Sequence, residues 1–247
     1  ELKIVEYEEL APLLLNGTVD IGVFTPFAYM DARLYSIRNN TPIQLFATHK
    51  SERKPGSRAV IATLKESKIN SVNDLKGKKF LFTNSSSATG YRVPLTWFRS
   101  NGIEPDHHFF DYDWSGSHDK SIKALCNGEV DGIATYLEAL DQEGVDAAKI
   151  NILWQSDFFV PNNAYVFAPA LDKNLADQIR GFMLGVKDNP VLMDKLFSGN
   201  PLQIEGWYAS DENTFNELRH VLNRKRIRPV ISLTFEQHSS IRAEDFG

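Results

Sequence analysis

The chain contains the same short pattern twice, at residues 14–23 (LLNGTVDIGV) and at residues 125–134 (LCNGEVDGIA). In each copy an apolar helix end meets Asn-Gly, where glycine suits the left-handed backbone of a helix cap, and a buried strand follows. The copies lie much further apart than the ~20–50-residue period of a solenoid. Coincidence is one explanation, because helix–glycine–strand junctions are common. Otherwise the repeat predicts two α/β lobes built on one plan.

Predicted strands and helices alternate along the chain. The opening residues 1–7 (ELKIVEY) alternate as a strand does, whereas residues 19–25 (VDIGVFT) form a nearly continuous apolar run, typical of a buried parallel strand. Residues 27–35 and 118–128 have the pattern of helices, and residues 107–114 (HHFFDYDW) that of another strand. This order predicts α/β units with parallel sheets.

The composition excludes several classes of protein. Of 247 residues, 42% are hydrophobic and 24% charged, which is typical of a globular protein with one large or two small domains. A net charge of −5 argues against a nucleic-acid partner, which needs a basic face. The single cysteine, Cys126, cannot form an internal disulfide and is expected to be buried. No apolar run approaches the ~20 residues of a membrane span, and no leader is visible, although the chain begins abruptly.

A loop rich in small hydroxyl residues follows the strand FLFT and leads into a helix, over residues 80–94 (FLFTNSSSATGYRVP). The first amides of a helix have no internal acceptor and carry the positive end of its dipole. Small residues leave room there for an oxyanion. The loop contains no lysine, so it is not a Walker-type nucleotide loop. Ordinary N-capping by serine or threonine is the alternative interpretation.

A second junction of this kind lies at residues 113–121 (DWSGSHDKS). Ser115, Gly116 and Ser117 form a tight entry to a helix, and His118 stands where the helix begins, so it could donate to a phosphoryl oxygen. A lone histidine at such a place is otherwise a cap or a surface residue. Both junctions follow the carboxyl ends of predicted parallel strands, where ligands bind in open α/β sheets.

Two catalytic alternatives are weaker. The adjacent histidines of residues 106–113 (DHHFFDYD) would point to opposite faces of an extended segment, so no metal site is predicted. Ser87, His118 and Asp119 could suggest a hydrolase triad. However, the chain has no Gly-X-Ser-X-Gly elbow, and neighbouring His and Asp side chains do not easily orient one another. We therefore do not expect an enzyme. A further set of aromatic residues is predicted either to line a cleft or to pack in the core: Phe24, Phe27 and Tyr29.

Four stretches together resemble the phosphate/phosphite/phosphonate-binding proteins of ABC importers. They are YEELAPLLLNGTVDIGVFTPFAY, SSSATGYRVP, SGSHDKSIKALCNGEVDGIA and LWQSDFFVPNNAYVF, and the resemblance extends from Tyr7 to Arg219. It implies a type II periplasmic-binding fold, with two α/β lobes of mixed, mostly parallel sheets that close on a small ligand through a two-strand hinge. The implied lobes are residues 1–60 with 162–247, and residues 61–161.

The resemblance also assigns residues to the phosphoryl end of the ligand. Ser87, Ala88 and Thr89 correspond to a Ser-Thr-Ser of the family that holds the phosphoryl oxygens, and Ala88 can contribute only its backbone amide. His118 matches the family histidine that contacts the same group, and Tyr7 matches a tyrosine that reaches in from the first lobe. The phosphoryl end of the site therefore resembles that of the family closely.

The other end of the site departs from the family. Glu138 falls where a carboxylate can recognise the amino group of an aminophosphonate. Asn163 stands in place of a second family acid near the hinge, which weakens the case for amine recognition, and Ser57 lies near a position that is aromatic in the family. The resemblance therefore implies that the part of the site that binds the phosphoryl group is kept as in the family, whereas the part that binds the organic substituent differs.

The function implied is that of an extracytoplasmic solute-binding protein, periplasmic or extracellular, free or anchored through a leader outside this chain. It would bind phosphonate, phosphite or phosphate for the membrane permease of an ABC transporter, without metal, cofactor or nucleic acid. A ligand-sensing domain of a membrane signalling protein is the alternative, and an enzyme on this fold is third. The family's first strand and helix would precede residue 1. The tail after Arg219, with strand-like residues 228–236, is expected to fill that place or to lead to another domain.

Overall fold

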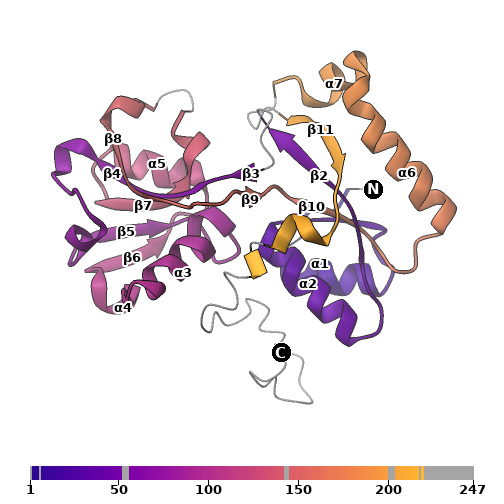
Figure 1. Ribbon diagram of the computed structural model, residues 1–247, viewed down its shortest axis with the longest axis horizontal. Helices are drawn as coiled ribbons and strands as arrows, with labels where there is room; N and C mark the ends of the chain where they lie inside the picture. Colours follow the sequence, from indigo (N-terminus) through magenta and orange to yellow (C-terminus); the bar gives the residue numbers. More distant parts are fainter. Residues whose placement is uncertain are drawn as a thin grey trace.

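The computed structural model describes residues 2–5, 7–51, 56–141, 145–199, 204–216 and 218–219. These residues form two α/β lobes, one on each side of a short two-stranded ladder (Figure 1). The ladder pairs β3 (Gly56–Ser57) with β9 (Val160–Pro161) in antiparallel fashion. A side chain at Gly56 would collide with the backbone of Val160, because an added Cβ would lie 1.9 Å from its carbonyl oxygen. Glycine therefore allows the two hinge strands to approach closely.

The first lobe is built from residues on both sides of the second. Its sheet has the order β1-β10-β2-β11. Its elements are α1 (Tyr7–Leu15), β1 (Ile21–Phe24), α2 (Pro26–Arg38), β2 (Gln44–Ser51), β10 (Ala164–Phe167), α6 (Lys173–Gly185), η6 (Val186–Asp188), α7 (Pro190–Phe197), β11 (Ile204–Ala209) and η7 (Glu212–Phe215).

The second lobe is continuous in sequence, and its sheet has the order β6-β5-β7-β4-β8. Its elements are β4 (Ala59–Leu64), η1 (Lys65–Ser67), η2 (Val72–Leu75), β5 (Lys79–Phe82), a π-helical turn η3 (Ala88–Arg92), α3 (Val93–Ser100), α4 (Pro105–His108), β6 (Asp111–Trp114), α5 (His118–Cys126), β7 (Gly132–Tyr136), η4 (Leu137–Asp141), η5 (Ala147–Lys149) and β8 (Ile150–Gln155). The lobe limits predicted above remain a prediction.

The expectation of mostly parallel sheets is wrong in detail. Among the described strands, only β5 pairs in parallel, with β6 and with β7. In the first lobe β10 lies between β1 and β2 and runs opposite to both. Strands β1 and β2 are therefore not neighbours, because β10 lies between them and pairs antiparallel with each. The sequence pattern indicates where strands occur but not which strands are neighbours.

The repeated phrase forms the same structure in both lobes, as predicted. Gly17 after α1 and Gly128 after α5 have φ of +74° and +71°. In both caps the next amide donates to the carbonyl five residues back, from Thr18 to Leu13 at 2.9 Å and from Glu129 to Ala124 at 3.0 Å. This 6→1 bond belongs to the Schellman cap, and β1 and β7 follow directly. The two lobes therefore share one helix–cap–strand plan.

Three expectations from the sequence are corrected. Residues 2–5 form no strand, and Leu2 and Ile4 are 87% and 92% exposed, because no neighbouring strand among the described residues pairs with them. His107 and His108 lie in the short helix α4 and not in an extended segment. Cys126 is exposed, because its place in α5 faces solvent while Leu125 beside it packs inward. The strand-like tail at 228–236 lies outside the described residues.

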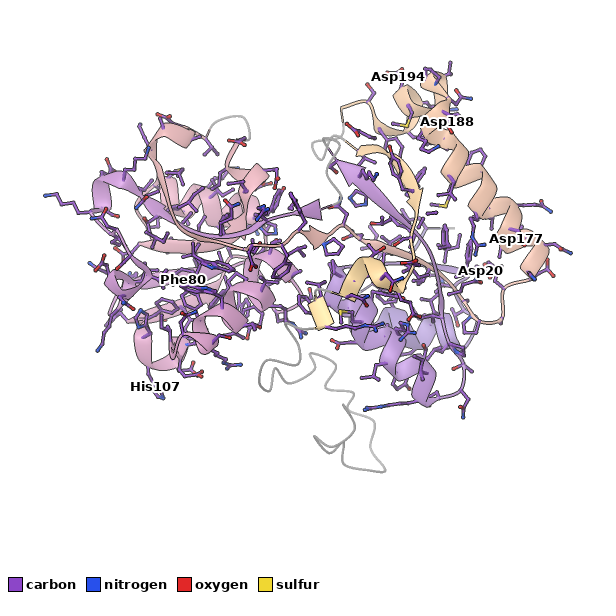
Figure 2. All side chains as sticks on the ribbon, in the orientation of Figure 1. Asp20, Phe80, His107, Asp177, Asp188 and Asp194 are labelled. Atoms are coloured by element: carbon purple, nitrogen blue, oxygen red, sulfur yellow. The ribbon has the colours of Figure 1, made fainter. Side chains whose placement is uncertain are left out.

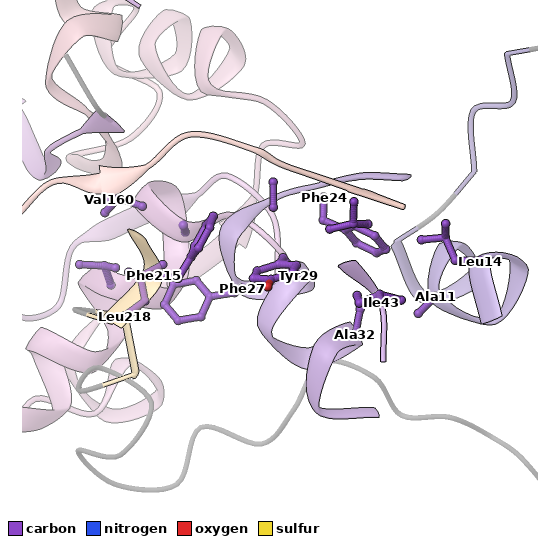
Figure 3. Close-up of a cluster of buried hydrophobic side chains, with 14 of the residues drawn as sticks. Ala11, Leu14, Phe24, Phe27, Tyr29, Ala32, Ile43, Val160, Phe215 and Leu218 are labelled. Atoms are coloured by element: carbon purple, nitrogen blue, oxygen red, sulfur yellow. The ribbon is translucent and has the colours of Figure 1, made fainter. Parts of the chain in front are cut away.

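Buried side chains of both lobes meet in one cluster beside the hinge (Figure 3). Phe27 of α2 packs in this cluster together with Ala88 and Val93 of the second lobe. Phe24, Phe27 and Tyr29 are core residues, with exposures of 0%, 0% and 2%. The separate core of the second lobe centres on Phe80, whose ring stacks on that of Phe109 (Figure 2). The lobes are thus in contact as well as tethered.

We predict that His49 makes folding sensitive to acid. His49 in β2 is 5% exposed, its Nδ1 has no partner among the described residues, and burial lowers its pKa to about 4. The unfolded chain, with an ordinary pKa near 6.5, takes up a proton that the folded chain does not. Stability is therefore lost as the pH falls from 6.5 toward 4, by roughly 1.4 kcal/mol per pH unit.

The measurement is the thermal unfolding midpoint of wild type and His49→Leu between pH 7 and pH 4.5. The variant should lose less stability on acidification, and His107→Leu, a substitution of an exposed histidine in α4, should behave as wild type. Parallel curves for wild type and His49→Leu would show that the buried imidazole does not titrate as described.

Candidate functional site

The site is organised around Thr83, the residue that follows β5. Its amide donates to Gly90 O at 3.1 Å, its carbonyl accepts from Gly116 N at 2.8 Å, and its hydroxyl donates to Ala134 O at 3.3 Å. One buried residue therefore joins the serine loop, the entry to α5 and strand β7. Since β5, β6 and β7 run in parallel, their carboxyl ends meet here, which is where ligands bind in open α/β sheets.

The serine loop enters its helix through the π-helical turn η3. In this turn Arg92 N donates to Ser87 O at 3.0 Å, and Val93 N donates to Ala88 O, so the first amides of the turn have no intrahelical acceptor. Ser87 caps one of them by accepting from Gly90 N at 3.0 Å. Among the described residues, the amides of Ala88 and Thr89 have no acceptor. They are available to an anion at the positive end of the helix.

Gly90 is required by close packing rather than by an unusual φ. A Cβ at this position would lie 2.0 Å from Thr83 Oγ1 and 2.9 Å from Ser87 Oγ. Both contacts are shorter than side chains tolerate, and neither atom can move without breaking a bond described above. The glycine therefore sets how closely the turn lies against the end of β5.

The second loop is fixed by its own serines. The Ser115 hydroxyl donates to Ser117 O at 2.8 Å and lies 2.6 Å from Ser121 Oγ, while Ser117 Oγ accepts from Lys120 N at 3.3 Å. Gly116, with φ of +87°, makes the turn between them. These hydroxyls hold the loop in shape, and the side chain that they leave for a ligand is His118, the first residue of α5.

His118 is held by threonines and is electrically neutral. Its Nδ1 lies 2.9 Å from Thr135 Oγ1 and 3.5 Å from Thr83 Oγ1, and its ring meets that of Tyr136 edge-on at 4.8 Å. Burial lowers the pKa of His118 to about 4, with Asp119 opposing the shift. Near pH 7 an anion would therefore meet dipoles at this corner and not an imidazolium.

Two polar contacts cross from the first lobe to the serine loop. Thr25 is the N-cap residue of α2 but makes no cap bond in its own helix. Its hydroxyl donates instead to Ser86 O at 3.3 Å. The Arg92 side chain, 1% exposed, donates from Nε to Ser85 O at 3.1 Å and lies 3.6 Å from Asp31 Oδ2 of α2. The first lobe thus contacts the backbone of the serine loop directly and through Arg92.

Asp31 contributes to stability in the opposite direction from His49. Burial raises its pKa to about 6, and the nearby Arg92 guanidinium only partly offsets this effect. Because the folded-state pKa lies above that of the unfolded chain, acidification from about pH 6 toward 4 favours the folded state through this group. For the Asp31 carboxylate, the effect of burial on the pKa is therefore larger than that of the nearby guanidinium.

Four predicted site residues remain: Glu138, Ser57, Asn163 and Tyr7. Glu138 is a half-buried residue of η4, after the carboxyl end of β7, and the preceding amide of Leu137 donates to Arg58 O at 2.9 Å. Ser57 is in the hinge strand β3, and Asn163 is between β9 and β10. Tyr7 begins α1, but its side chain is outside the part of the chain that the structure describes.

The geometry offers no support for the catalytic alternatives. Nδ1 of His118 faces threonine hydroxyls, whereas a hydrolase triad needs a carboxylate there. Within the described residues, no group of three or more His, Cys, Asp or Glu could hold a metal ion, and His107 lies at the outer edge of the second lobe (Figure 2). No described helix combines the length and apolar character of a membrane span.

Sequence reasoning missed the residues that support the site. Thr83, Thr135 and Arg92 each position a predicted ligand-binding segment. Thr83 could have been found, because it ends a predicted strand at the edge where ligands bind. No local signal marks Thr135 or Arg92, since their partners His118 and Asp31 are distant in sequence and the contacts depend on the packing of strands and lobes.

The two α/β lobes joined by a short two-stranded ladder have the fold of periplasmic binding proteins. Residues 1–213 match the family described as ABC transporter, phosphonate, periplasmic substrate-binding protein. The match covers most of the chain, and the chain belongs to this family. Membership of this periplasmic family implies that the protein is located outside the cytoplasm.

Individual relatives agree with this assignment. The chain is 26% identical over 188 residues to the phosphate-import protein PhnD of Mycolicibacterium smegmatis, covering 71% of this chain and 57% of the relative. It is 28% identical over 157 residues to the phosphonates-binding periplasmic protein of Escherichia coli, covering 60% and 46%. The chain thus spans about half the length of these relatives. A binding protein component of an ABC phosphonate transporter from Pseudomonas aeruginosa has the same fold, with a TM-score of 0.70, 22% identity and coverage of 87% and 72%.

We predict that Gly90→Ala distorts the serine loop. The added methyl group would force Thr83 and Ser87 apart, and overpacking of this kind costs typically ~1–3 kcal/mol. Denaturant unfolding should show that loss. Gly181→Ala in α6, where nothing lies within 4 Å of the added carbon, should be neutral or stabilising. Equal stability of the two variants would refute the close packing at Gly90.

Proposed function

We propose that the protein is a solute-binding protein that holds a small phosphorus oxyanion and delivers it to the membrane permease of an ABC transporter. The ligand would be a phosphonate, phosphite or phosphate, bound in the periplasmic or extracellular space. The observation that carries the proposal is the pair of acceptor-free amides at Ala88 and Thr89, beside the neutral donor site of His118. The family of substrate-binding transport proteins supports a carrier rather than an enzyme.

The phosphoryl group would bind the second lobe. Its oxygens accept from the amides of Ala88 and Thr89, from the hydroxyls of Ser87 and Thr89, and from His118. Ser87 can donate its proton to the ligand while its oxygen accepts from Gly90 N. The ligand keeps its charge, and dipoles that are already oriented stabilise it without a counter-ion.

The organic or hydrogen substituent would face the hinge and the first lobe. We propose that Glu138, Asn163, Ser57 and Tyr7 surround it. Asn163 and Ser57 are small and uncharged, so they add neither a second carboxylate nor an aromatic wall. This composition favours a compact substituent over an extended cationic one.

Closure of the lobes would complete the site. We take the lobes to be residues 1–60 with 162–247, and residues 61–161, joined by the β3–β9 ladder. The contacts of Thr25 with Ser86 and of Asp31 with Arg92 cross between the lobes and support a closed arrangement in which water is excluded and each hydrogen bond to the ligand is strengthened. The permease would then distinguish closed from open protein.

The test is calorimetric titration with methylphosphonate, phosphite, phosphate and sulfate. Wild type should bind at least one of the three phosphorus oxyanions more tightly than sulfate. The Ser87→Ala/Thr89→Val double variant should weaken that binding by roughly 1.5–3 kcal/mol for each lost charge-assisted bond. Ser100→Ala, which removes a hydroxyl at the far end of α3, is the matched control. Unchanged affinity in the double variant would contradict the proposed site.

A further inference from the structure

The His118 ring contacts a buried hydroxyl, that of Thr135, which has one hydrogen-bond partner among the described residues. Thr135 in β7 is completely buried. Among the described residues, the sole hydrogen-bond partner of its hydroxyl is Nδ1 of His118, at 2.9 Å. A buried hydroxyl without a hydrogen-bond acceptor destabilises the protein by the full cost of its desolvation. The Thr135 proton therefore has one place to go, which is the lone pair of Nδ1.

The second threonine does not compete for this assignment. The Thr83 hydroxyl donates to Ala134 O at 3.3 Å, and its oxygen is 3.5 Å from Nδ1, at the outer limit of a hydrogen bond. The shorter contact, to Thr135, decides which nitrogen carries the proton. A neutral imidazole whose Nδ1 accepts a hydrogen bond carries its proton on Nε2.

We propose that Thr135 is a positioning residue that fixes His118 as its Nε2–H tautomer, so that this corner of the site presents a donor to the ligand. Among the described residues Nε2 has no partner, so it is left for the ligand. The ligand oxygen at this corner must then be an acceptor without a proton. The proposal rests on the proposed function for its ligand, while the tautomer is a property of the free protein.

The consequence is selectivity for the ionised phosphoryl group. A protonated oxygen placed against Nε2–H would bring two donors together, which costs affinity. Asp119 of α5 is the charged group that acts on the pKa of His118, and the ring of Tyr136 meets the imidazole edge-on. Asp119 only partly opposes the effect of burial on the pKa of His118, so the imidazole is neutral near pH 7.

The tautomer can be read directly from long-range proton–nitrogen NMR spectra of the histidine ring in the free, full chain. Wild type should carry its ring proton on Nε2. In Thr135→Val, which keeps the shape and removes the hydroxyl, the ring proton should move toward Nδ1, and Thr135→Ser should restore the wild-type spectrum. A wild-type ring that carries its proton on Nδ1 would overturn the proposal, and so would a Thr135→Val spectrum identical to wild type.

Binding provides the second readout, with methylphosphonate as the probe. Thr135→Val should weaken binding by about tenfold, the value of one hydrogen bond, and Thr135→Ser should recover it. The matched control is Thr63→Val in the neighbouring strand β4, because Thr63 is equally buried and its hydroxyl has no partner among the described residues. Equal affinity of Thr135→Val and Thr63→Val would overturn the role of Thr135.

These readouts separate two kinds of failure. If wild type binds no phosphonate, phosphite or phosphate, the proposed function fails, but the ring spectrum of the free protein still decides the tautomer. If wild type binds methylphosphonate and its ring carries the proton on Nδ1, the function stands and the positioning role fails. If Thr135→Val does not fold, the spectra of wild type and Thr135→Ser still show whether the ring proton of His118 is on Nε2, as proposed, or on Nδ1, which would overturn the proposal.

Discussion

The proposed site depends on backbone amides at the start of a helix that have no acceptor among the described residues. The first intrahelical bond of the π-helical turn is made by Arg92 N, so the amides before it have no intrahelical acceptor, and among the described residues those of Ala88 and Thr89 have none elsewhere. Such amides are costly when buried and unpaired, and the loop is nearly buried, with Ser87 and Thr89 only 8% and 9% exposed. These unpaired amides lie where three parallel strands end, and for this reason we propose a compact anion as the ligand.

The rest of the lobe serves to hold this turn in place. Thr83 ties the turn to the second loop and to β7, and Gly90 permits the close approach. Thr25 of the first lobe binds the carbonyl of Ser86, and Arg92 of the second lobe binds the carbonyl of Ser85. Arg92 supplies positive charge near the loop, but it is paired with Asp31 across the lobes and so acts mainly as a structural bridge. Specificity is therefore left to oriented dipoles.

Much of this was predictable from local patterns. The duplicated Asn-Gly caps identified two related lobes, because a left-handed glycine after a helix is a local requirement. The serine loop and His118 were predicted as site residues because helix starts at strand ends bind anions by a general rule, and this remains a prediction. Strand neighbours, the exposure of residues 2–5 and the position of Cys126 were not predictable in this way. Those features depend on which distant segments pack together, as do Thr135 and the Arg92–Asp31 pair.

A crystal structure of the protein with methylphosphonate tests the central claim most directly. The phosphoryl oxygens should lie within hydrogen-bond distance of the amides of Ala88 and Thr89 and of His118 Nε2, with the methyl group toward Ser57 and Asn163. If the ligand binds elsewhere, or if those two amides remain unoccupied beside a bound phosphonate, the account of this site is wrong.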